Sequence, residues 1–248
     1  MIYFVGAGPG AVDLISVRGE RLLKQADVVI YAGSLVNPEL LNNCKPGCAK
    51  YDSAGMTLGD VIDVMKADQG IIVRLHTGDP SIYGAIREQM DALRALNRAF
   101  EIVPGISSFC AAAAALEAEY TLPGVSQTVI ISRMAGRTPV PEREQIEALA
   151  SHGATMVLFL SAGMIPELCL ALVRGGYRAD TPCAIVYRAS WPDQLVIRGN
   201  LHTIADMAKA QGIGRQALVC VGDFLGDDYE LSKLYDASFA HGYREAAK

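Results

Sequence analysis

The residues of this chain best suited to chemistry lie in short polar segments that follow apolar runs. In Leu75-His76-Thr77-Gly78-Asp79-Pro80 an apolar run ends in a glycine and a carboxylate, and Tyr83 follows with a hydroxyl-bearing ring. Gly78 would let a ligand approach the backbone, and the Asp79-Pro80 pair places an exposed carboxylate at a break in regular structure. Pro104-Gly105-Ile106-Ser107-Ser108 also follows an apolar run, with hydroxyls and N–H groups at a predicted helix start. Taken one at a time, these segments are explained more simply as turns and caps.

A basic stretch in the second half of the chain could bind acidic groups. Residues 132–144 carry glycine, two prolines and three arginines, Arg133, Arg137 and Arg143, which is typical of a functional loop. Because arginine binds carboxylates through a planar pair of donors, the stretch predicts a site for a ligand with several carboxylates. A solvated surface loop is the alternative. Another such segment, Tyr187-Arg188-Ala189-Ser190-Trp191-Pro192, follows an apolar run and holds the single tryptophan.

The start of the chain resembles a dinucleotide-binding loop, but its context argues against one. Ile2–Val5 runs into Gly6-Ala7-Gly8-Pro9-Gly10, a backbone bare enough for a ligand to come close. A Rossmann fold needs an acidic residue at the end of its second strand, and 30–34 contains none. Pro9 removes an N–H where a pyrophosphate needs donors, and the next helix is predicted to begin only at a cap on Asp13. A nicotinamide-dependent oxidoreductase is therefore disfavoured.

Apolar runs that alternate with helical spacing predict an α/β protein with mostly parallel sheets and connecting helices. Asp13 and Thr57 are the predicted N-caps of two of the helices. The predicted strands are Ile2–Val5, Val28–Tyr31, Ile71–Leu75, Glu101–Val103, Thr128–Ser132, Met156–Leu160, Ala184–Tyr187, Leu195–Arg198 and Leu218–Val221. Leu122-Pro123-Gly124 interrupts the pattern, which predicts an N-terminal domain over 1–120 and a C-terminal domain over 121–248.

Composition excludes several classes of function. The net charge of −5 argues against a broad nucleic-acid surface, and no apolar stretch approaches the length of a membrane span. The start also lacks the basic region and long apolar core of a secretory signal. Cys44 and Cys48 are spaced like half of a zinc site, but no second pair follows them. We therefore expect no metal, and six reduced cysteines in a cytoplasmic protein.

In their order along the chain, these segments resemble the tetrapyrrole (corrin/porphyrin) methylases, which use S-adenosylmethionine. The resemblance covers nearly the whole chain and rests on Val5-Gly6-Ala7-Gly8-Pro9-Gly10, on Gly78-Asp79-Pro80 with Tyr83-Gly84, and on Pro104-Gly105-Ile106-Ser107. Three further segments look like the methylases that act on carbon 11 of precorrin-4 or cobalt-precorrin-4 in cobalamin synthesis. They are Tyr31–Val36, His76–Ser81 and Ser132–Pro139.

The resemblance implies two dissimilar α/β domains with the active site in a cleft between them, assembled as a homodimer. The methyl donor, S-adenosyl-L-methionine, would contact Pro9, Thr77, Gly78, Asp79, Ile82, Ser107, Ser108, Leu160 and Ala189. Leu160 stands where some relatives have methionine, so a backbone contact is expected there. The tetrapyrrole substrate would contact Gly8, Tyr83, Arg133 and Arg137.

The implied reaction is attack by a ring carbon on the sulfonium methyl group, in which the protein aligns carbon, methyl and sulfur. Asp79 is the candidate catalytic residue, either by positioning the donor or by easing proton loss. His76 could line the substrate site or serve a structural role. Three alternatives stay open: methylation at another ring carbon, an NAD-dependent oxidoreductase, and a non-catalytic binding protein for a small ligand. Whether the substrate carries cobalt is also open.

Overall fold

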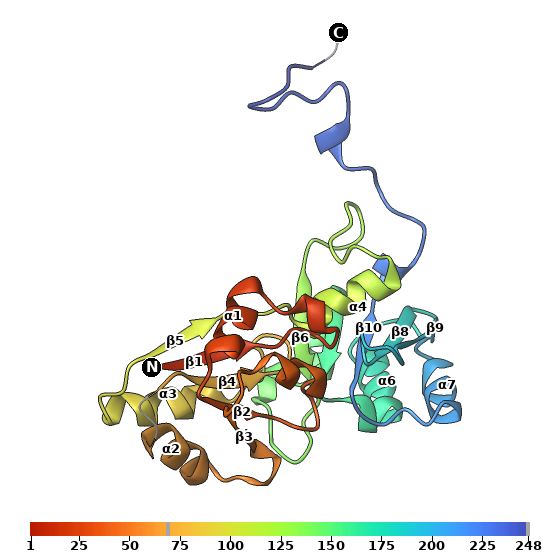
Figure 1. Cartoon of the computed structure of the whole chain (residues 1–248). Coiled ribbons are helices and arrows are strands. Elements are labelled where there is room, and N and C mark those ends of the chain that lie inside the picture. Colours follow the sequence, from red (N-terminus) through yellow and green to blue (C-terminus); the bar gives the residue numbers. More distant parts are fainter. Residues whose placement is uncertain (68–69, 247–248) are drawn as a thin grey trace. The chain divides into compact units, whose positions relative to one another are not determined.

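The computed structural model describes residues 1–67 and 70–246, which form two compact units (Figure 1). The first holds Met1–Ala112 and Arg188–Gln194, and the second holds Ala113–Tyr187 and the chain from Leu195 onward. The division falls inside helix α4 (Ser108–Leu116). The domain limits 1–120 and 121–248 stay a prediction about independently folding parts.

The first unit is built on a sheet of five parallel strands in the order β3-β2-β4-β1-β5. The strands are β1 (Ile2–Gly6), β2 (Val28–Tyr31), β3 (Ala49–Asp52), β4 (Ile72–His76) and β5 (Phe100–Val103). β4, β1 and β5 are neighbours and run in one direction, so their carboxyl ends meet at one edge. The polar segments at 6–10, 77–80 and 104–108 leave from that edge.

Both faces of the three central strands, β2, β4 and β1, are buried, and these strands are mostly apolar. On one face Val5, Val29 and Leu75 pack with α1 (Val17–Gln25) and the 3₁₀ helix Pro38–Asn43. Residues of the opposite register, such as Ile2, Phe4 and Ile30, form the other face with α2 (Leu58–Ala67) and α3 (Ile86–Ala95).

One of the two predicted helix caps is confirmed and the other is wrong. Asp60 N donates to Thr57 Oγ1 at 3.2 Å and Thr57 N donates to Asp60 Oδ2 at 2.8 Å, so Thr57 caps α2. Asp13 instead lies inside a 3₁₀ turn, Val12–Leu14, and Ser16 caps α1 by accepting from Gly19 N at 3.0 Å. The extra turn separates the glycine segment from the helix.

The second unit has a mixed sheet in the order β6-β7-β10-β8-β9, in which only β6 and β7 are parallel. Its strands are β6 (Val129–Arg133), β7 (Thr155–Phe159), β8 (Pro182–Tyr187), β9 (Leu195–Asn200) and β10 (Ala217–Val221). The prediction of mostly parallel sheets is wrong here. Seven residues join β8 to β9, too few for the crossover that a parallel pair requires.

Three helices accompany the second sheet: α5 (Ile146–Ala150), α6 (Ile165–Arg174) and α7 (Ile204–Ala210). Leu168 and Leu172 of α6 and Ile204 of α7 share a core cluster with Met156 and Ile185 of the strands. No helix in 1–67 or 70–246 combines the length and apolar character needed to cross a membrane.

Candidate functional site

Three loops follow the carboxyl ends of β4, β1 and β5, and backbone hydrogen bonds join the loops after β1 and β4. Ala7 N donates to His76 O at 2.7 Å. Gly8 and Gly78 form an isolated antiparallel bridge, with N–H···O distances of 3.3 and 2.8 Å. This edge, beyond the carboxyl ends of parallel strands, is where ligands bind in open α/β sheets.

The glycines at this edge have two different roles. Gly8 (φ +77°) and Gly78 (φ +61°) adopt the left-handed conformation that favours glycine. Gly6 and Gly105 lack a side chain for another reason. A Cβ on Gly105 would lie 2.2 Å from Gly78 O, and one on Gly6 would lie 2.5 Å from Gly105 Cα. We expected Gly6, as part of the opening glycine segment, to be open to a ligand, but protein backbone occupies that space.

Asp79 joins two of the three loops. Its Oδ2 accepts from Gly105 N at 2.8 Å, and its Oδ1 accepts from Ser81 N at 2.8 Å and from Ser81 Oγ. Burial is the largest single influence and opposes the charge, but the bonds from Ser81 and Gly105 together outweigh it and lower the pKa of Asp79. The carboxylate is therefore ionised at neutral pH and weakly basic.

A strained turn follows Asp79 and carries two of the predicted contacts, Ile82 and Tyr83. Ile82 N donates to Asp79 O at 3.2 Å, and Tyr83 (φ +56°) and Ala85 (φ +49°) are both left-handed. Gln89 Nε2 donates to Ala85 O at 3.0 Å, which fixes the start of α3. Tyr83 is 45% exposed, so a ligand can reach this residue from solvent. Strain of this kind persists where the surrounding structure enforces it, as at binding sites.

His76, at the end of β4, is 6% exposed. Burial and the charge of Arg74 lower its pKa to about 3. Its Nε2 has no hydrogen-bond partner among the described residues, and its ring lies tilted against that of Phe4, 6.1 Å away between centroids. His76 is therefore a neutral, buried imidazole beneath the loops.

The segment Arg188–Gln194 belongs to the first unit although it connects β8 to β9. Trp191 Nε1 donates to Pro9 O at 3.1 Å, and Ala11 N donates to Ser190 Oγ at 3.0 Å. This brings Ala189, which is buried, into the same unit as Pro9. We singled out this segment from the sequence but did not predict Trp191 as a partner of the glycine loop, because Trp191 and Pro9 lie 182 residues apart.

Most of the predicted donor contacts therefore lie together in the first unit. Ser107 Cα and Ser108 N come within 3.5 Å of the Cβ position of Gly78, and Thr77 is half-buried beside them. Leu160 belongs to the second unit, where it follows β7. It is left-handed (φ +54°) and 66% exposed, which is an unusual combination for a large apolar residue.

The predicted substrate contacts Arg133 and Arg137 also belong to the second unit. Arg133 folds its own loop by donating to the carbonyls of Met134 (3.1 Å), Thr138 (3.2 Å) and Pro139 (2.8 Å). These acceptors are neutral, so the positive charge of Arg133 is not compensated by them. Arg137 is exposed on the same loop.

All six cysteines are free thiols. Cys169, Cys183 and Cys220 are buried, and burial raises the pKa of Cys220 to about 12. Burial, with the neighbouring Cys44, raises the pKa of Cys48 to about 11, which disfavours the thiolate that binds metals. Within the described part of the chain, no group of three or more His, Cys, Asp or Glu side chains could hold a metal ion.

Comparison with known proteins identifies the family. The family model of tetrapyrrole (corrin/porphyrin) methylases matches residues 1–205. A cobalt-precorrin-4 C(11)-methyltransferase of Methanocaldococcus jannaschii is 51% identical over 251 residues, which cover 100% of this chain and 97% of that protein.

Two solved structures agree. A cobalt precorrin-4 methyltransferase of cobalamin biosynthesis has a TM-score of 0.89 at 44% identity, covering 91% of this chain and 96% of that one. A uroporphyrin-III C-methyltransferase from Thermus thermophilus, complexed with S-adenosylhomocysteine, has a TM-score of 0.75 at 26% identity, covering 90% and 92%. The chain belongs to the tetrapyrrole methylase family.

Proposed function

We propose that this chain is an S-adenosylmethionine-dependent C-methyltransferase of cobalamin biosynthesis that methylates carbon 11 of precorrin-4 or cobalt-precorrin-4. The similarity to the Methanocaldococcus enzyme over the full chain carries the choice of reaction. The loops at the carboxyl ends of β4, β1 and β5 support the choice of donor, because they present left-handed glycines and small hydroxyl residues at one edge.

The chemistry of this edge fits an S-adenosyl donor. When bound, the donor would supply an electrophilic methyl group: the ring carbon would form the new C–C bond, the C–S bond would break with its electrons left on sulfur, and the positive charge passed to the macrocycle would be lost with a proton. The ionised carboxylate of Asp79 gives the edge a negative charge that suits a sulfonium ligand. Because its oxygens accept from Ser81 and Gly105, Asp79 also holds the loops in place. Its lowered pKa favours this positioning role over that of a general base.

The other predicted contacts keep their proposed roles. Pro9, Thr77, Gly78, Ile82, Ser107, Ser108, Leu160 and Ala189 would hold the donor together with Asp79. Gly8, Tyr83, Arg133 and Arg137 would bind the tetrapyrrole. The two arginines fit its carboxylates because the acceptors of Arg133 are neutral carbonyls and Arg137 is exposed.

A thermal-shift and calorimetric comparison tests the donor. S-adenosylhomocysteine should bind and raise the melting temperature, and NAD should do neither, because a ligand that binds only the folded state stabilises it. Stabilisation by NAD alone would favour the oxidoreductase alternative. Donor binding without methyl transfer to any precorrin would favour a binding protein.

The methylated carbon needs a separate measurement. Carbon NMR of the product made from ¹³C-methyl-labelled donor should show the label on carbon 11. A label on another ring carbon would keep the methyltransferase and overturn the assignment. Running the reaction with precorrin-4 and with cobalt-precorrin-4 decides which form is accepted.

We infer further that the protein forms a homodimer in the cytoplasm. The six free thiols support a reducing compartment. Five large apolar side chains near the C-terminus support self-association, since each is 40–100% exposed: Leu231, Leu234, Tyr235, Phe239 and Tyr243. Together they expose on the order of 500 Å². If each copy docks these segments on the other, both sets of side chains and the two surfaces that they cover are buried, roughly 2,000 Å² in total. That area is enough for a stable dimer.

Light scattering after size exclusion tests the dimer. The wild-type chain should elute at twice its mass of 26.5 kDa, and Tyr235→Asp with Tyr243→Asp should shift it to the monomer. A monomeric wild type would overturn the dimer. A double variant that stays dimeric would place the interface elsewhere.

A further inference from the structure

Three side chains hold the backbone of the opening glycine loop, one for each of its successive residues. Trp191 Nε1 donates to Pro9 O at 3.1 Å, and Asn37 Nδ2, which is buried, donates to Gly10 O at 2.9 Å. Ala11 N donates to Ser190 Oγ at 3.0 Å. Two of these three side chains come from Arg188–Gln194, far away in the sequence.

The indole of Trp191 also packs on the loop. A Cβ on Gly10 would lie 2.0 Å from Trp191 Cδ1, so only glycine leaves room for the ring. The Arg188 guanidinium lies over the ring, 4.0 Å from its centroid, and forms an ion pair with Asp193. The tryptophan is therefore held by contacts on its ring and at its N–H.

The segment that carries Trp191 is strained and is hydrogen-bonded within itself. Arg188 (φ +45°) and Ser190 (φ +68°) are left-handed without being glycine, and Ser190 N donates to Gln194 Oε1 at 2.7 Å. Such conformations persist only where the surroundings enforce them, and they concentrate at functional positions. Ala189 lies between the two strained residues.

We propose that Trp191 is a positioning residue for the methyl donor. Its N–H and ring fix Pro9 relative to Ala189, and these two proposed donor contacts come from opposite halves of the sequence. A binding site keeps its affinity when neighbouring side chains hold its backbone in the bound geometry. The inference rests on the proposed function, since it takes Pro9 and Ala189 as donor contacts.

Trp191→Phe tests the hydrogen bond while keeping an aromatic ring on Gly10. We expect the Kd for S-adenosylhomocysteine, measured by calorimetry, to rise about 3- to 10-fold, as for the loss of one hydrogen bond. The KM for the donor should rise in parallel. The kcat at saturating donor and the KM for the tetrapyrrole should stay within about twofold, because the chemical step and the acidic substrate do not use this bond.

Tyr177→Phe is the matched control. Tyr177 Oη donates to Ala154 O in the second unit, so this variant also removes one bond from an aromatic side chain to a backbone carbonyl. It should lower the melting temperature and leave the Kd for S-adenosylhomocysteine unchanged. If both variants weaken binding equally, the effect of Trp191 is general destabilisation and the proposal is wrong.

Fluorescence gives a test that needs no variant. Trp191 is the single tryptophan, so titrating the wild type with S-adenosylhomocysteine should change its emission with the calorimetric Kd, and NAD should leave it unchanged. If Trp191→Phe does not fold, Ser190→Ala replaces it in calorimetry, because it frees Ala11 N at the same loop.

The outcomes separate the two proposals. A wild type that does not bind S-adenosylhomocysteine overturns the proposed function. A wild type that binds it, with unchanged emission and an unchanged Kd in the variant, overturns only the role of Trp191.

Discussion

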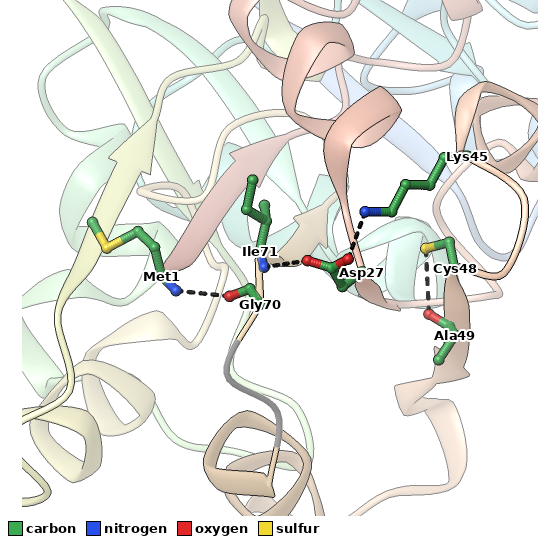
Figure 2. A network of polar contacts seen from close by, with 7 residues as sticks. All are labelled: Met1, Asp27, Lys45, Cys48, Ala49, Gly70 and Ile71. Carbon is green, nitrogen blue, oxygen red and sulfur yellow. Dashed lines mark hydrogen bonds and ion pairs between the residues drawn. The ribbon is translucent and has the colours of Figure 1, made fainter.

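The backbone at the two edges of the first sheet is held in place by different kinds of contact. At the amino edge, a side chain forms hydrogen bonds with the backbone. Asp27 accepts from Ile71 N at 2.7 Å and forms an ion pair with Lys45. The Met1 amino group donates to Gly70 O nearby (Figure 2). At the carboxyl edge, side chains such as Asp79 also bind backbone, but here backbone packs directly on backbone as well: the Cβ position of Gly105 lies 2.2 Å from Gly78 O.

This difference separates scaffold from site. A side chain can rotate when its surroundings change, so the amino edge should tolerate substitution. Packed backbone cannot rotate out of the way. The carboxyl edge also carries the left-handed residues Tyr83 and Ala85, and His76, whose Nε2 has no hydrogen-bond partner in the part of the chain that the structure describes. The rigid edge is also the one to which we assign the donor.

The strongest test of the contrast is a pair of glycine substitutions. Gly105→Ala would place a Cβ against Gly78 O and Gly6 Cα, and we expect it to cost about 3 kcal/mol of unfolding free energy and to abolish donor binding. At the amino edge, a Cβ on Gly70 would meet the Asp27 carboxylate, which can rotate. Gly70→Ala should therefore cost less and leave the Kd for S-adenosylhomocysteine unchanged. If urea unfolding shows that both variants lose the same unfolding free energy, the two edges do not differ in their tolerance of substitution.

Asp79→Asn is expected to have the next largest effect. An amide nitrogen cannot accept from Gly105 N or Ser81 N, so the variant leaves one of the loops unheld. Because water reaches the half-buried carboxylate, the loss of stability should be modest, about 1–2 kcal/mol. The Kd for S-adenosylhomocysteine should rise more than tenfold if Asp79 aligns the donor loops. A variant that keeps wild-type affinity would contradict this role.

A smaller effect should appear in the pH dependence of stability. The folded pKa of His76, about 3, is below the usual 6.5, so the unfolded chain takes up a proton first as the pH falls. The stabilising contribution is complete above pH 6.5 and shrinks below it, by about 1–2 kcal/mol at pH 5. His76→Phe should remove this part of the dependence of the unfolding free energy on pH, measured by urea unfolding at pH 5 to 7.

The sequence predicted the carboxyl edge better than the amino edge. Apolar runs predicted each strand except β3, whose Ala49–Asp52 is short, polar and largely exposed at the end of the sheet. In a parallel sheet such runs bring the following loops to one edge, so the site segments could be grouped from sequence alone. The amino edge carries no comparable motif, and its Asp27 looked like any other surface carboxylate.

What sequence could not predict depends on contacts between distant residues. Trp191 and Pro9 are joined only by the fold, and no local pattern pairs them. The mixed order of the second sheet has the same origin, since β10 lies between β7 and β8, to which it is antiparallel. The glycine motif was recognised correctly, but the reason for Gly6 was not, because the crowding there comes from Gly105 and Gly78 at the ends of other strands.

The smallest expected effect is that of Asp27→Asn, and it sharpens the contrast from the amino edge. The hydrogen bond from Lys45, and then that from Ile71 N, lower the pKa of Asp27. The contribution of Asp27 to the stability of the folded state is therefore present above the usual pKa of 3.8. It is lost as the pH falls through the lower pKa that Asp27 has in the folded protein. The variant should melt slightly below the wild type at pH 7. The difference should shrink in 1 M salt, which screens the exposed pair with Lys45, and vanish in strong acid.

The Kd for S-adenosylhomocysteine should not change, because the carboxylate lies at the opposite ends of the strands from the donor loops. A weakened Kd would show that the two edges are energetically coupled, and the division into tolerant scaffold and rigid site would then fail.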